Sequence, residues 1–463
     1  MHLSWNLPDL RLKRTAETLL QDMMRQQQVS IRRLGGGRAQ QVRYGRFLAN
    51  RRVIVQELVD SVCSTLGSRV QGRHVLLLED TSELNYQSHA GRVKELGTVG
   101  NGKDLGLFLH PVLAVDAQDY SCLGLAHVHL WRRTQGKAAN YKQLPIQDKE
   151  SHRWLSAPEQ AMKRIPTAEK VTVIADREAD IYEMFKILPE KGANLLIRVC
   201  RNRKVHDEHS DQAQRLYDWL ATLPEAGRYH LELPALPGKR KAREAVLQVR
   251  FAPLTLHSPK THKIASQCPV WAIEVQEDPS TVPEGENPLL WRLLTTHSLQ
   301  SVEDALQCVD WYRQRWHIEQ LFRTLKRQGL DIESSEIEYG DRLTKLAVLA
   351  TYTAVQTLQL TMARDGGNDR PYTDCFAEEE YPLLKQLCGR LEGKTEKQRN
   401  PHKPHTLAWC AWIIARLGGW KGYASERKPG PLTMLYGLQQ WKTMKEGWLL
   451  AISIMGGRDV CTP

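Results

Sequence analysis

The spacing of hydrophobic and polar positions changes along the chain. Residues 1–70 carry apolar positions at helical spacing and few strand-like runs, with a break at the glycines Gly35 to Gly37. From residue 74 the pattern changes to short apolar runs separated by polar or glycine-containing turns. The three runs are 74–84, 107–117 and 122–131. The sequence therefore predicts a small helical unit followed by three successive strands.

Alternating strand and helix patterns follow those three runs. Residues 148–165 predict a helix, residues 171–188 predict a buried strand that leads directly into a helix, and residues 193–200 predict another strand. Three strands, a helix, and then strand, helix and strand is the order of a ribonuclease H-like core. We therefore expect an α/β fold with the first part of such a core over residues 71–200.

The remaining chain shows two further patterns of hydrophobic and polar positions. Residues 201–290 contain strand-like runs linked by basic or proline-rich turns, which predicts a β-strand insertion. Residues 291–345 return to the core, and residues 346–463 are predominantly helical. The expected order is a helical N-terminal domain, an interrupted catalytic core and a helical C-terminal domain.

The net charge of the chain suggests what kind of molecule it binds. Lys and Arg outnumber Asp and Glu by 64 to 53, which gives a formal charge of +11 and favours a polyanionic partner over the alternative of a merely basic protein. Much of the excess lies in the first 70 residues. There, we expect a DNA-contacting face rather than a solvated basic face, and its candidates are Arg32, Arg33, Arg38 and Arg46.

Cysteine usage and hydropathy point to a cellular compartment. The nine cysteines include no Cys-x-x-Cys pair, so neither a zinc knuckle nor a disulfide framework is expected. The N-terminus lacks a signal-peptide pattern, and no uncharged apolar run approaches about 20 residues. We expect a soluble cytoplasmic protein without a membrane partner.

The segment "DWYRQRWHIEQLFRTLKRQG" (310–329) contains one acid, Glu319, between Arg313 and Arg327. Treated as one helix, it places four polar residues within roughly 60° of one another beside an apolar stripe. The four residues are Tyr312, Arg315, Glu319 and Lys326. The alternative is a surface ladder of Arg315, Glu319 and Arg323, in which each pair contributes only about 0.3–0.5 kcal/mol.

Two further carboxylates end apolar runs. Asp80 ends "HVLLLED" and Asp176 ends "VTVIAD". The pattern alone does not choose between Asp80 and Glu79, and the rivals of Asp176 are Glu178 and Asp180; Asp176 also suits a helix N-cap. Two strand acids and one helix acid form a hard-oxygen set suited to two Mg²⁺ or Mn²⁺ ions, which catalyse phosphodiester transfer.

These motifs resemble those of the bacterial insertion-sequence-four family of DDE transposases, the group that contains the transposon-five enzyme. "YRQRWHIEQLFRTLK" is similar to its Tyr-x2-Arg-x3-Glu-x6-Lys motif, and "EDTSELNY" and "ADREADIYE" are similar to its two aspartate motifs. The resemblance selects Asp80 over Glu79. It implies that Asp80, Asp176 and Glu319 are the catalytic metal ligands and that Tyr312, Arg315 and Lys326 hold DNA phosphates.

The resemblance extends over most of the chain and carries further expectations. Trp291 stands at the spacing of a tryptophan that stacks on a flipped DNA base, where the alternative is core packing, and Arg198 matches a DNA-contacting arginine. The implied activity is cut-and-paste transposition: binding of transposon-end inverted repeats, nicking, hairpin formation and transfer of 3′ ends into double-stranded target DNA. The implied assembly is a homodimer formed through the C-terminal domain in a bacterial, nucleoid-associated protein.

Two other classes of function stay open at this point. One is a metal-dependent DNA nuclease without strand transfer, and the other is a transposase-derived DNA-binding regulator. The intact set of three acids beside a basic helix argues against a pure binder, which has no need of three carboxylates near phosphate.

Overall fold

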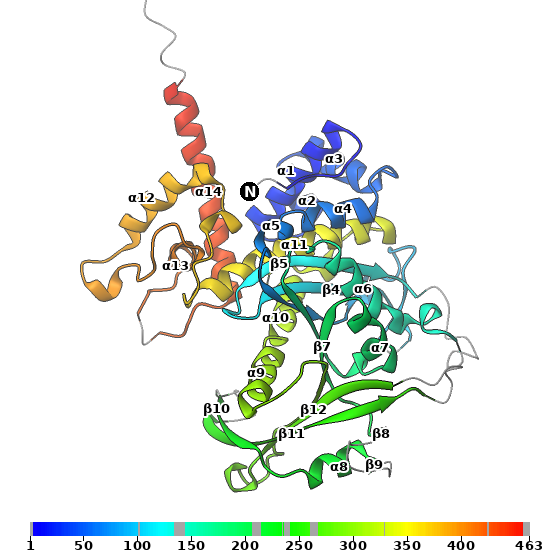
Figure 1. Ribbon diagram of the computed structural model, residues 1–463. Helices are drawn as coiled ribbons and strands as arrows, with labels where there is room; N and C mark the ends of the chain where they lie inside the picture. Colours follow the sequence, from blue (N-terminus) through cyan, green and yellow to red (C-terminus); the bar gives the residue numbers. More distant parts are fainter. Residues whose placement is uncertain are drawn as a thin grey trace, which may run out of the picture.

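The computed structural model of the protein describes most of the chain. The described residues are 3–100, 102–133, 144–205, 214–233, 235, 241–259, 267–327, 329–423 and 426–456. They form a central mixed sheet with helices around it (Figure 1). The predicted α/β class is therefore confirmed, while the finer fold family stays a prediction.

The sheet has eleven strands in one hydrogen-bonded layer. They are β1 (His74–Glu79), β2 (Ser82–Asn85), β3 (Gly97–Val99), β4 (Asp104–Asp116), β5 (Cys122–Trp131), β6 (Lys170–Ala175), β7 (Ala193–Arg198), β10 (Gly227–Leu233), β11 (Arg243–His257), β12 (Gln267–Glu277) and β13 (Leu290–Thr295). The order is β10-β11-β12-β13-β7-β6-β1-β4-β2, with β3 and β5 also paired to β4. β8 (Lys204–Val205) and β9 (Gln214–Arg215) form a separate two-stranded sheet.

The middle of the large sheet explains where the strand ends meet. β1 pairs with β6 in parallel, and β6 pairs with β7 in parallel, whereas β4 is antiparallel to both β1 and β5. Five of the six residues of β1 and of β6 are buried, as expected for strands covered on both faces. Their carboxyl ends therefore lie side by side at one edge, where Asp80 and Asp176 follow.

Strands β10, β11 and β12, which account for the strand-like runs predicted within residues 201–290, join the large sheet, whereas β8 and β9 form the separate small sheet. β12 pairs with β13, and β13 pairs with β7 through Leu293 and Arg198. A second difference lies at residues 74–84, where the single predicted strand is divided because β1 ends at Glu79 and β2 begins at Ser82. The two intervening residues, Asp80 and Thr81, therefore leave the ladder.

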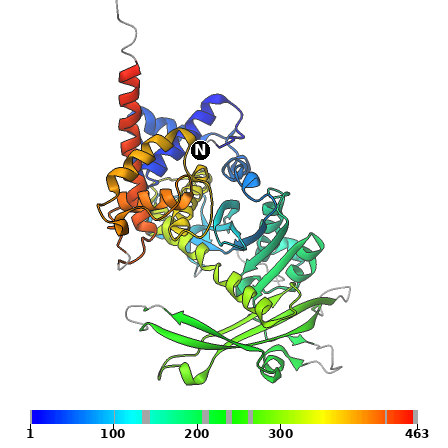
Figure 2. The ribbon, with the colours of Figure 1, turned by 60° about the vertical axis from the view of Figure 1, so that its left-hand side comes forward.

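Helices cover the sheet and extend beyond it. The α-helices are α1 (Leu10–Gln26), α2 (Ile31–Leu34), α3 (Arg38–Ala49), α4 (Val55–Cys63), α5 (Leu66–Arg69), α6 (Arg153–Met162), α7 (Tyr182–Glu190), α8 (Leu216–Thr222), α9 (Val302–Arg313), α10 (Trp316–Lys326), α11 (Gly340–Ala363), α12 (Tyr381–Leu391), α13 (Leu407–Leu417) and α14 (Pro431–Gly456). As predicted, helices make up most of residues 10–69, and they break at the glycine run, between α2 and α3. The N-terminal helices and the C-terminal helices lie at one end of the molecule, and strands β10 to β12 lie at the other (Figures 1 and 2).

Helix α11 is the central support of this helical end. It contacts α1, α3, α4, α10, α13 and α14, as well as strand β5. It is long and apolar enough to cross a membrane, yet 94% of its most apolar window is buried inside the protein. Lys345 on α11 donates to the carbonyl oxygens of Leu48 and Asn50, at the end of α3. The helix therefore joins the N-terminal helices to the sheet and to α10.

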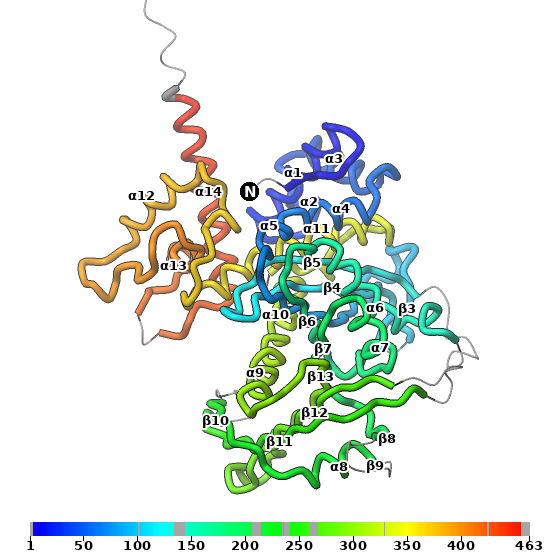
Figure 3. Tube along the Cα trace, in the orientation of Figure 1, coloured from blue at the N-terminus to red at the C-terminus, as the bar shows by residue number. Residues whose placement is uncertain are grey.

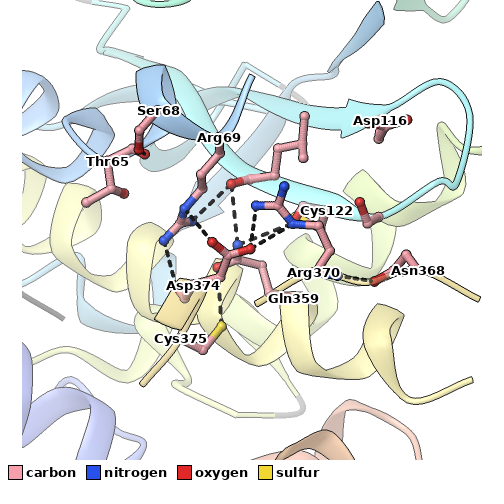
Figure 4. A network of polar contacts seen from close by, with 12 residues as sticks. Thr65, Ser68, Arg69, Asp116, Cys122, Gln359, Asn368, Arg370, Asp374 and Cys375 are labelled. Carbon is pink, nitrogen blue, oxygen red and sulfur yellow. Dashed lines mark hydrogen bonds and ion pairs between the residues drawn. The ribbon is translucent and has the colours of Figure 1, made fainter. Parts of the chain in front are cut away.

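A buried charge cluster attaches the C-terminal helices to the core (Figure 4). The Asp374 carboxylate lies between two arginines: Arg69 Nε is 3.2 Å from Oδ1, and Arg370 Nε donates to Oδ2 at 2.7 Å. Arg69 also donates to the carbonyl oxygens of Leu123 and Asp374. All three charged side chains are at most 8% exposed, so this cluster holds α5, β5 and the segment after α11 together.

Candidate active site

Three carboxylates converge at the carboxyl edge of the parallel strands. Asp80 directly follows β1, Asp176 directly follows β6, and Glu319 lies on α10. The strand register pairs Leu78 with Ile174, so the two aspartates leave neighbouring strands at the same level. The chain thus brings together residues that are 96 and 143 positions apart in sequence.

One guanidinium contacts all three acids. Arg315 Nη1 donates to Asp80 Oδ2 at 2.8 Å, and its Nη2 donates to Glu319 Oε1 at 2.5 Å. The same Nη2 is 3.9 Å from Asp176 Oδ2. The Arg315 side chain is 11% exposed, and the acids are 23 to 32% exposed. Glu319 is therefore not part of a solvated surface ladder, and Arg323 instead stacks over the Trp316 ring at 4.9 Å.

Burial perturbs the ionisation of this cluster. The pKa of Asp80 is raised to about 6 because burial disfavours its charged form, and Asp176 and Glu319 raise it further. Arg315 and the Thr81 backbone N–H oppose this rise. Burial alone would lower the pKa of Arg315, but its anionic neighbours outweigh burial and raise it. Arg315 therefore stays charged and partly compensates three clustered acids.

Tyr312 completes the cluster from the end of α9. Its side chain is 6% exposed, and its hydroxyl donates to Asp176 Oδ1 at 3.4 Å. Burial raises the pKa of this hydroxyl to about 12, so it remains a neutral donor at physiological pH. The predicted grouping of Tyr312, Arg315 and Glu319 is present in the structure, while their roles in catalysis stay predictions.

The helix that carries them differs from the expected single helix over 310–329. Helix α9 ends at Arg313 and α10 begins at Trp316, although the Cα trace runs directly from one into the other (Figure 3). Around the junction the backbone N–H groups of Gln314 and Arg315 bond three residues back, to Trp311 and Tyr312. A stretch of this tighter 3₁₀ geometry within a helix often marks a functional hinge or a strained segment. A uniform 100° rotation per residue therefore does not hold through Arg315.

Lys326 forms an ion pair with an acid outside the set of three carboxylates, and its predicted contact with DNA phosphate stays a prediction. Its Nζ is 3.3 Å from Glu333 Oε1, and the same oxygen accepts a hydrogen bond from the Asn85 backbone N–H at 2.9 Å. Lys326 is the last residue of α10, and Glu333 belongs to the following 3₁₀ turn, Ile332–Ser334. The long lysine side chain therefore turns toward the chain that follows α10.

The rival acids have other partners. Glu79 is fully buried and faces the His110 ring at 3.1 Å, and burial raises the pKa of Glu79 and lowers that of His110. Glu178 binds Arg153, and Asp180 binds Arg203 and two backbone N–H groups. The choice of Asp80 and Asp176 therefore agrees with the placement of these side chains.

A cavity of about 530 Å³ lies next to Arg177, the residue that follows Asp176 in the sequence. Trp291 and Arg198, both predicted to contact DNA, line it together with Arg177, Arg292 and Tyr217. Trp291 is half-buried, which leaves part of its ring accessible. Arg292 stacks over the Tyr217 ring at 4.1 Å. The cavity therefore combines aromatic faces with guanidinium groups, although nothing in it tests the predicted role of Trp291.

The N-terminal candidates form an exposed set. Arg32 and Arg33 lie on α2, and Arg38 and Arg46 lie on α3. All four are exposed, and the described residues provide none of them with an ion pair. A DNA contact by these arginines stays a prediction.

The residues around Arg315 fit a divalent metal in donor chemistry. Three carboxylates supply the hard oxygen ligands that Mg²⁺ and Mn²⁺ favour. Their oxygens are arranged around the guanidinium, and the described part of the chain contains no group of three or more Asp, Glu, His or Cys already gathered close enough to hold an ion. A metal site here therefore requires the carboxylates to close on a common point.

Several residues near the site were missed at the sequence level. Thr81 accepts from Arg153 Nε at 2.9 Å, and its own N–H donates to Asp80 Oδ1. Glu333 holds Lys326, as described above. Thr81 lies inside the aspartate motif and had a local signal, whereas Arg153 is one arginine among many in a predicted amphipathic helix.

Comparison with known families agrees with this geometry. Residues 151–355 match the family model described as the transposase DDE domain. The matched range contains Asp176, Glu319 and Arg315 and begins after Asp80. A domain of this family implies nuclease and transposition chemistry on DNA, and such enzymes generally use divalent metal ions. Residues 151–355, less than half of the chain, are therefore similar to a transposase DDE domain.

Proposed function

We propose that the protein is a cut-and-paste DNA transposase of the insertion-sequence-four type, with a ribonuclease H-like catalytic core. The convergence of Asp80, Asp176 and Glu319 on Arg315 is the observation that carries the proposal. The strand order β5-β4-β1-β6-β7, with β1, β6 and β7 parallel, supports the proposed core.

The three acids would hold two Mg²⁺ ions, or Mn²⁺ in their place. When bound, these ions supply activation of the attacking oxygen and stabilisation of the leaving oxygen in phosphodiester transfer. Arg315 keeps the acids near one another before DNA binds, because its guanidinium contacts all three. Its five fixed N–H donors also suit a phosphate, so the same side chain can hold the DNA backbone beside the carboxylates.

The other polar residues position DNA around that centre. Tyr312 stays a neutral donor and orients Asp176. Lys326 extends the cationic surface at the end of α10. Trp291 and Arg198 line the cavity next to Arg177, where an aromatic ring and a cation would hold an unstacked base and its phosphate during hairpin formation.

Recognition of transposon-end inverted repeats is proposed for the helical N-terminal domain. The exposed arginines Arg32, Arg33, Arg38 and Arg46 would contact the phosphates of double-stranded DNA. Lys345 ties the end of α3 to α11, and α11 packs against α10. End recognition is therefore attached to the catalytic helix through one buried element.

A homodimer is proposed for the synaptic complex. The outer half of α14 projects from the body of the protein (Figure 1) and exposes large apolar side chains. These are Leu449, Leu450, Ile452 and Ile454, which are 48 to 62% exposed. A second copy of the chain would bury them. A bacterial, cytoplasmic, nucleoid-associated protein is part of the same proposal.

Mutation of Glu319 tests the catalytic part of the proposal. Glu319→Ala should retain binding to DNA that carries the flanking inverted repeats and should lose Mg²⁺-dependent nicking. Glu336→Ala is a matched control, because Glu336 is an exposed acid in the segment after α10. Both proteins are assayed with end-labelled DNA in gel-shift and nicking reactions. Normal nicking by Glu319→Ala would refute the assignment.

A second assay distinguishes a transposase from a nuclease or a regulator. Pre-cleaved ends with a labelled 3′ hydroxyl are incubated with the protein and a supercoiled target plasmid. Joining of the label to the plasmid supports strand transfer. Cleavage without joining would indicate a nuclease, and binding without cleavage would indicate a regulator.

A further inference from the structure

Arg153 links the two loops that carry the catalytic aspartates. It is the first residue of α6, and its Nε donates to Thr81 Oγ1 at 2.9 Å, in the loop after β1. Its Nη2 donates to Glu178 Oε2 at 2.7 Å, in the turn after β6. The two acceptors follow Asp80 by one residue and Asp176 by two. One guanidinium therefore spans the gap between the loops.

The Arg153 side chain is itself held in place. Its Nη1 donates to the Glu150 carbonyl oxygen at 3.0 Å, so each nitrogen of the guanidinium has an acceptor. The guanidinium carbon lies 5.3 Å from the centroid of the Trp131 ring and 5.1 Å from that of Trp154. The side chain is 11% exposed. Two aromatic faces and three hydrogen bonds therefore leave it a single orientation.

The loops that Arg153 joins also orient the aspartates through their backbones. The Thr81 N–H donates to Asp80 Oδ1 at 2.8 Å, and the Arg177 N–H donates to Asp176 Oδ1 at 2.7 Å. Arg177 begins the same short 3₁₀ turn, Arg177–Ala179, that contains Glu178. Displacing either loop would therefore rotate the aspartate that it holds.

Arg315 and Arg153 act on the aspartates from different positions. Arg315 contacts the carboxylate oxygens directly, so DNA or metal ions compete with it for the same atoms. Arg153 contacts Thr81 and Glu178 and leaves the oxygens of Asp80 and Asp176 untouched. The Arg153 link consequently persists when the site is loaded.

We infer that Arg153 is a positioning residue that sets the separation and orientation of Asp80 and Asp176 through Thr81 and Glu178. The inference rests on the proposed function, since it concerns the carboxylates assigned there to metal binding. Only a planar fork satisfies both loops at once, and a lysine ammonium on the same helix position keeps the charge but loses the second contact.

The primary test compares Arg153→Lys with Arg164→Lys in the full-length protein. Arg164 is a 15%-exposed arginine just after the same helix, and it binds Asp60 away from the aspartate loops. Arg153→Lys should weaken Mn²⁺ binding by the DNA-free protein, followed by electron paramagnetic resonance, by about 10- to 100-fold. Nicking should fall within the same range, while end-DNA binding and the melting temperature should equal those of Arg164→Lys. Mn²⁺ affinity equal to wild type, or an effect no larger than that of Arg164→Lys, would overturn the inference.

A second variant guards against misfolding of Arg153→Lys. The Glu178 side chain is 71% exposed, so Glu178→Ala removes one end of the link without opening the core. It should weaken Mn²⁺ binding, and Glu178→Gln, whose amide oxygen still accepts from Arg153, should recover part of the loss. Wild-type Mn²⁺ affinity in Glu178→Ala would overturn the inference.

The outcomes separate this inference from the proposed function. Asp80→Asn provides the reference for a lost site. If the wild-type chain neither nicks DNA nor binds Mn²⁺ more tightly than Asp80→Asn, both ideas fail. If the wild-type chain does both and the Arg153 variants match it, only the positioning role fails.

Discussion

Replacing Asp80 by asparagine should make the metal-free protein more stable and catalytically inactive. Burial raises the pKa of Asp80 from 3.8 to about 6 in the folded chain, so folding costs free energy whenever this carboxyl is ionised. The shift corresponds to about 3 kcal/mol, since each unit is worth about 1.36 kcal/mol. Asparagine fills nearly the same volume without the charge, so its unfolding free energy should exceed that of wild type by up to this amount.

The gain in unfolding free energy on replacing Asp80 by asparagine should increase with pH. A carboxyl whose pKa is raised by folding binds a proton more readily in the native state, so its cost appears as pH rises from about 3.8 to about 6 and is constant above that. The difference between the two proteins should be about 3 kcal/mol at pH 8 and roughly half of that at pH 5. It should vanish below pH 3.8.

Urea unfolding in EDTA at pH 8 and pH 5, followed by circular dichroism, measures this difference directly. Asp80→Asn should also lose Mg²⁺-dependent nicking of end DNA. A variant that is less stable than wild type at pH 8 would refute the reasoning, because the ionised carboxylate would then be stabilised by the fold. An equal difference at both pH values would refute it as well, since the effect would not come from ionisation.

Three further changes test other parts of the structure. Asp374→Ala leaves Arg69 and Arg370 buried without their carboxylate and should lower the unfolding free energy by about 3–5 kcal/mol in urea titrations; a loss below 1 kcal/mol would contradict the buried charge cluster. Lys345→Met removes the ammonium bonded to two carbonyls at the end of α3, which should cost about 1–3 kcal/mol and speed amide exchange in α3, and unchanged exchange would contradict the anchoring role. Trp291→Ala should impair hairpin formation more than first-strand nicking on gels, whereas equal loss of both would indicate a packing role.

Local sequence patterns were sufficient for most of the elements and for the grouping of Tyr312, Arg315 and Glu319. Buried strands that end in acids, and an amphipathic helix with a polar stripe, carry their own signals, so Asp80, Asp176 and Glu319 were identified as candidates before any contact was known. The motif resemblance was still needed to choose Asp80 over Glu79. The structure gives a physical reason for that choice. Glu79 is the last residue of β1 and is buried against His110, whereas Asp80 follows the end of the strand.

Other features depend on distant contacts that no local pattern contains. The pairing of β13 with β7 joins residues about 100 positions apart, so the sequence could not show that the expected insertion continues the central sheet. The preference of Lys326 for Glu333 depends on a turn whose position is set by Asn85. Arg153 is recognisable only when Thr81 and Glu178 are seen on either side of it. The break between α9 and α10 also has no local signal in the sequence, because neither Gln314 nor Arg315 is a helix breaker.

The single sheet also fixes the interval between Asp176, proposed as a metal ligand, and Trp291, proposed to hold an unstacked base. Asp176 follows β6, Arg198 ends β7, and Trp291 belongs to β13, and these three strands are consecutive neighbours. At about 4.8 Å per strand, the interval from the carboxylate strand to the aromatic strand is about 10 Å. Hydrogen bonds from β7 to β13 and to β6 hold this interval constant. Lengthening the hairpins between β10, β11 and β12, at the far end of the sheet, would therefore leave that interval unaltered.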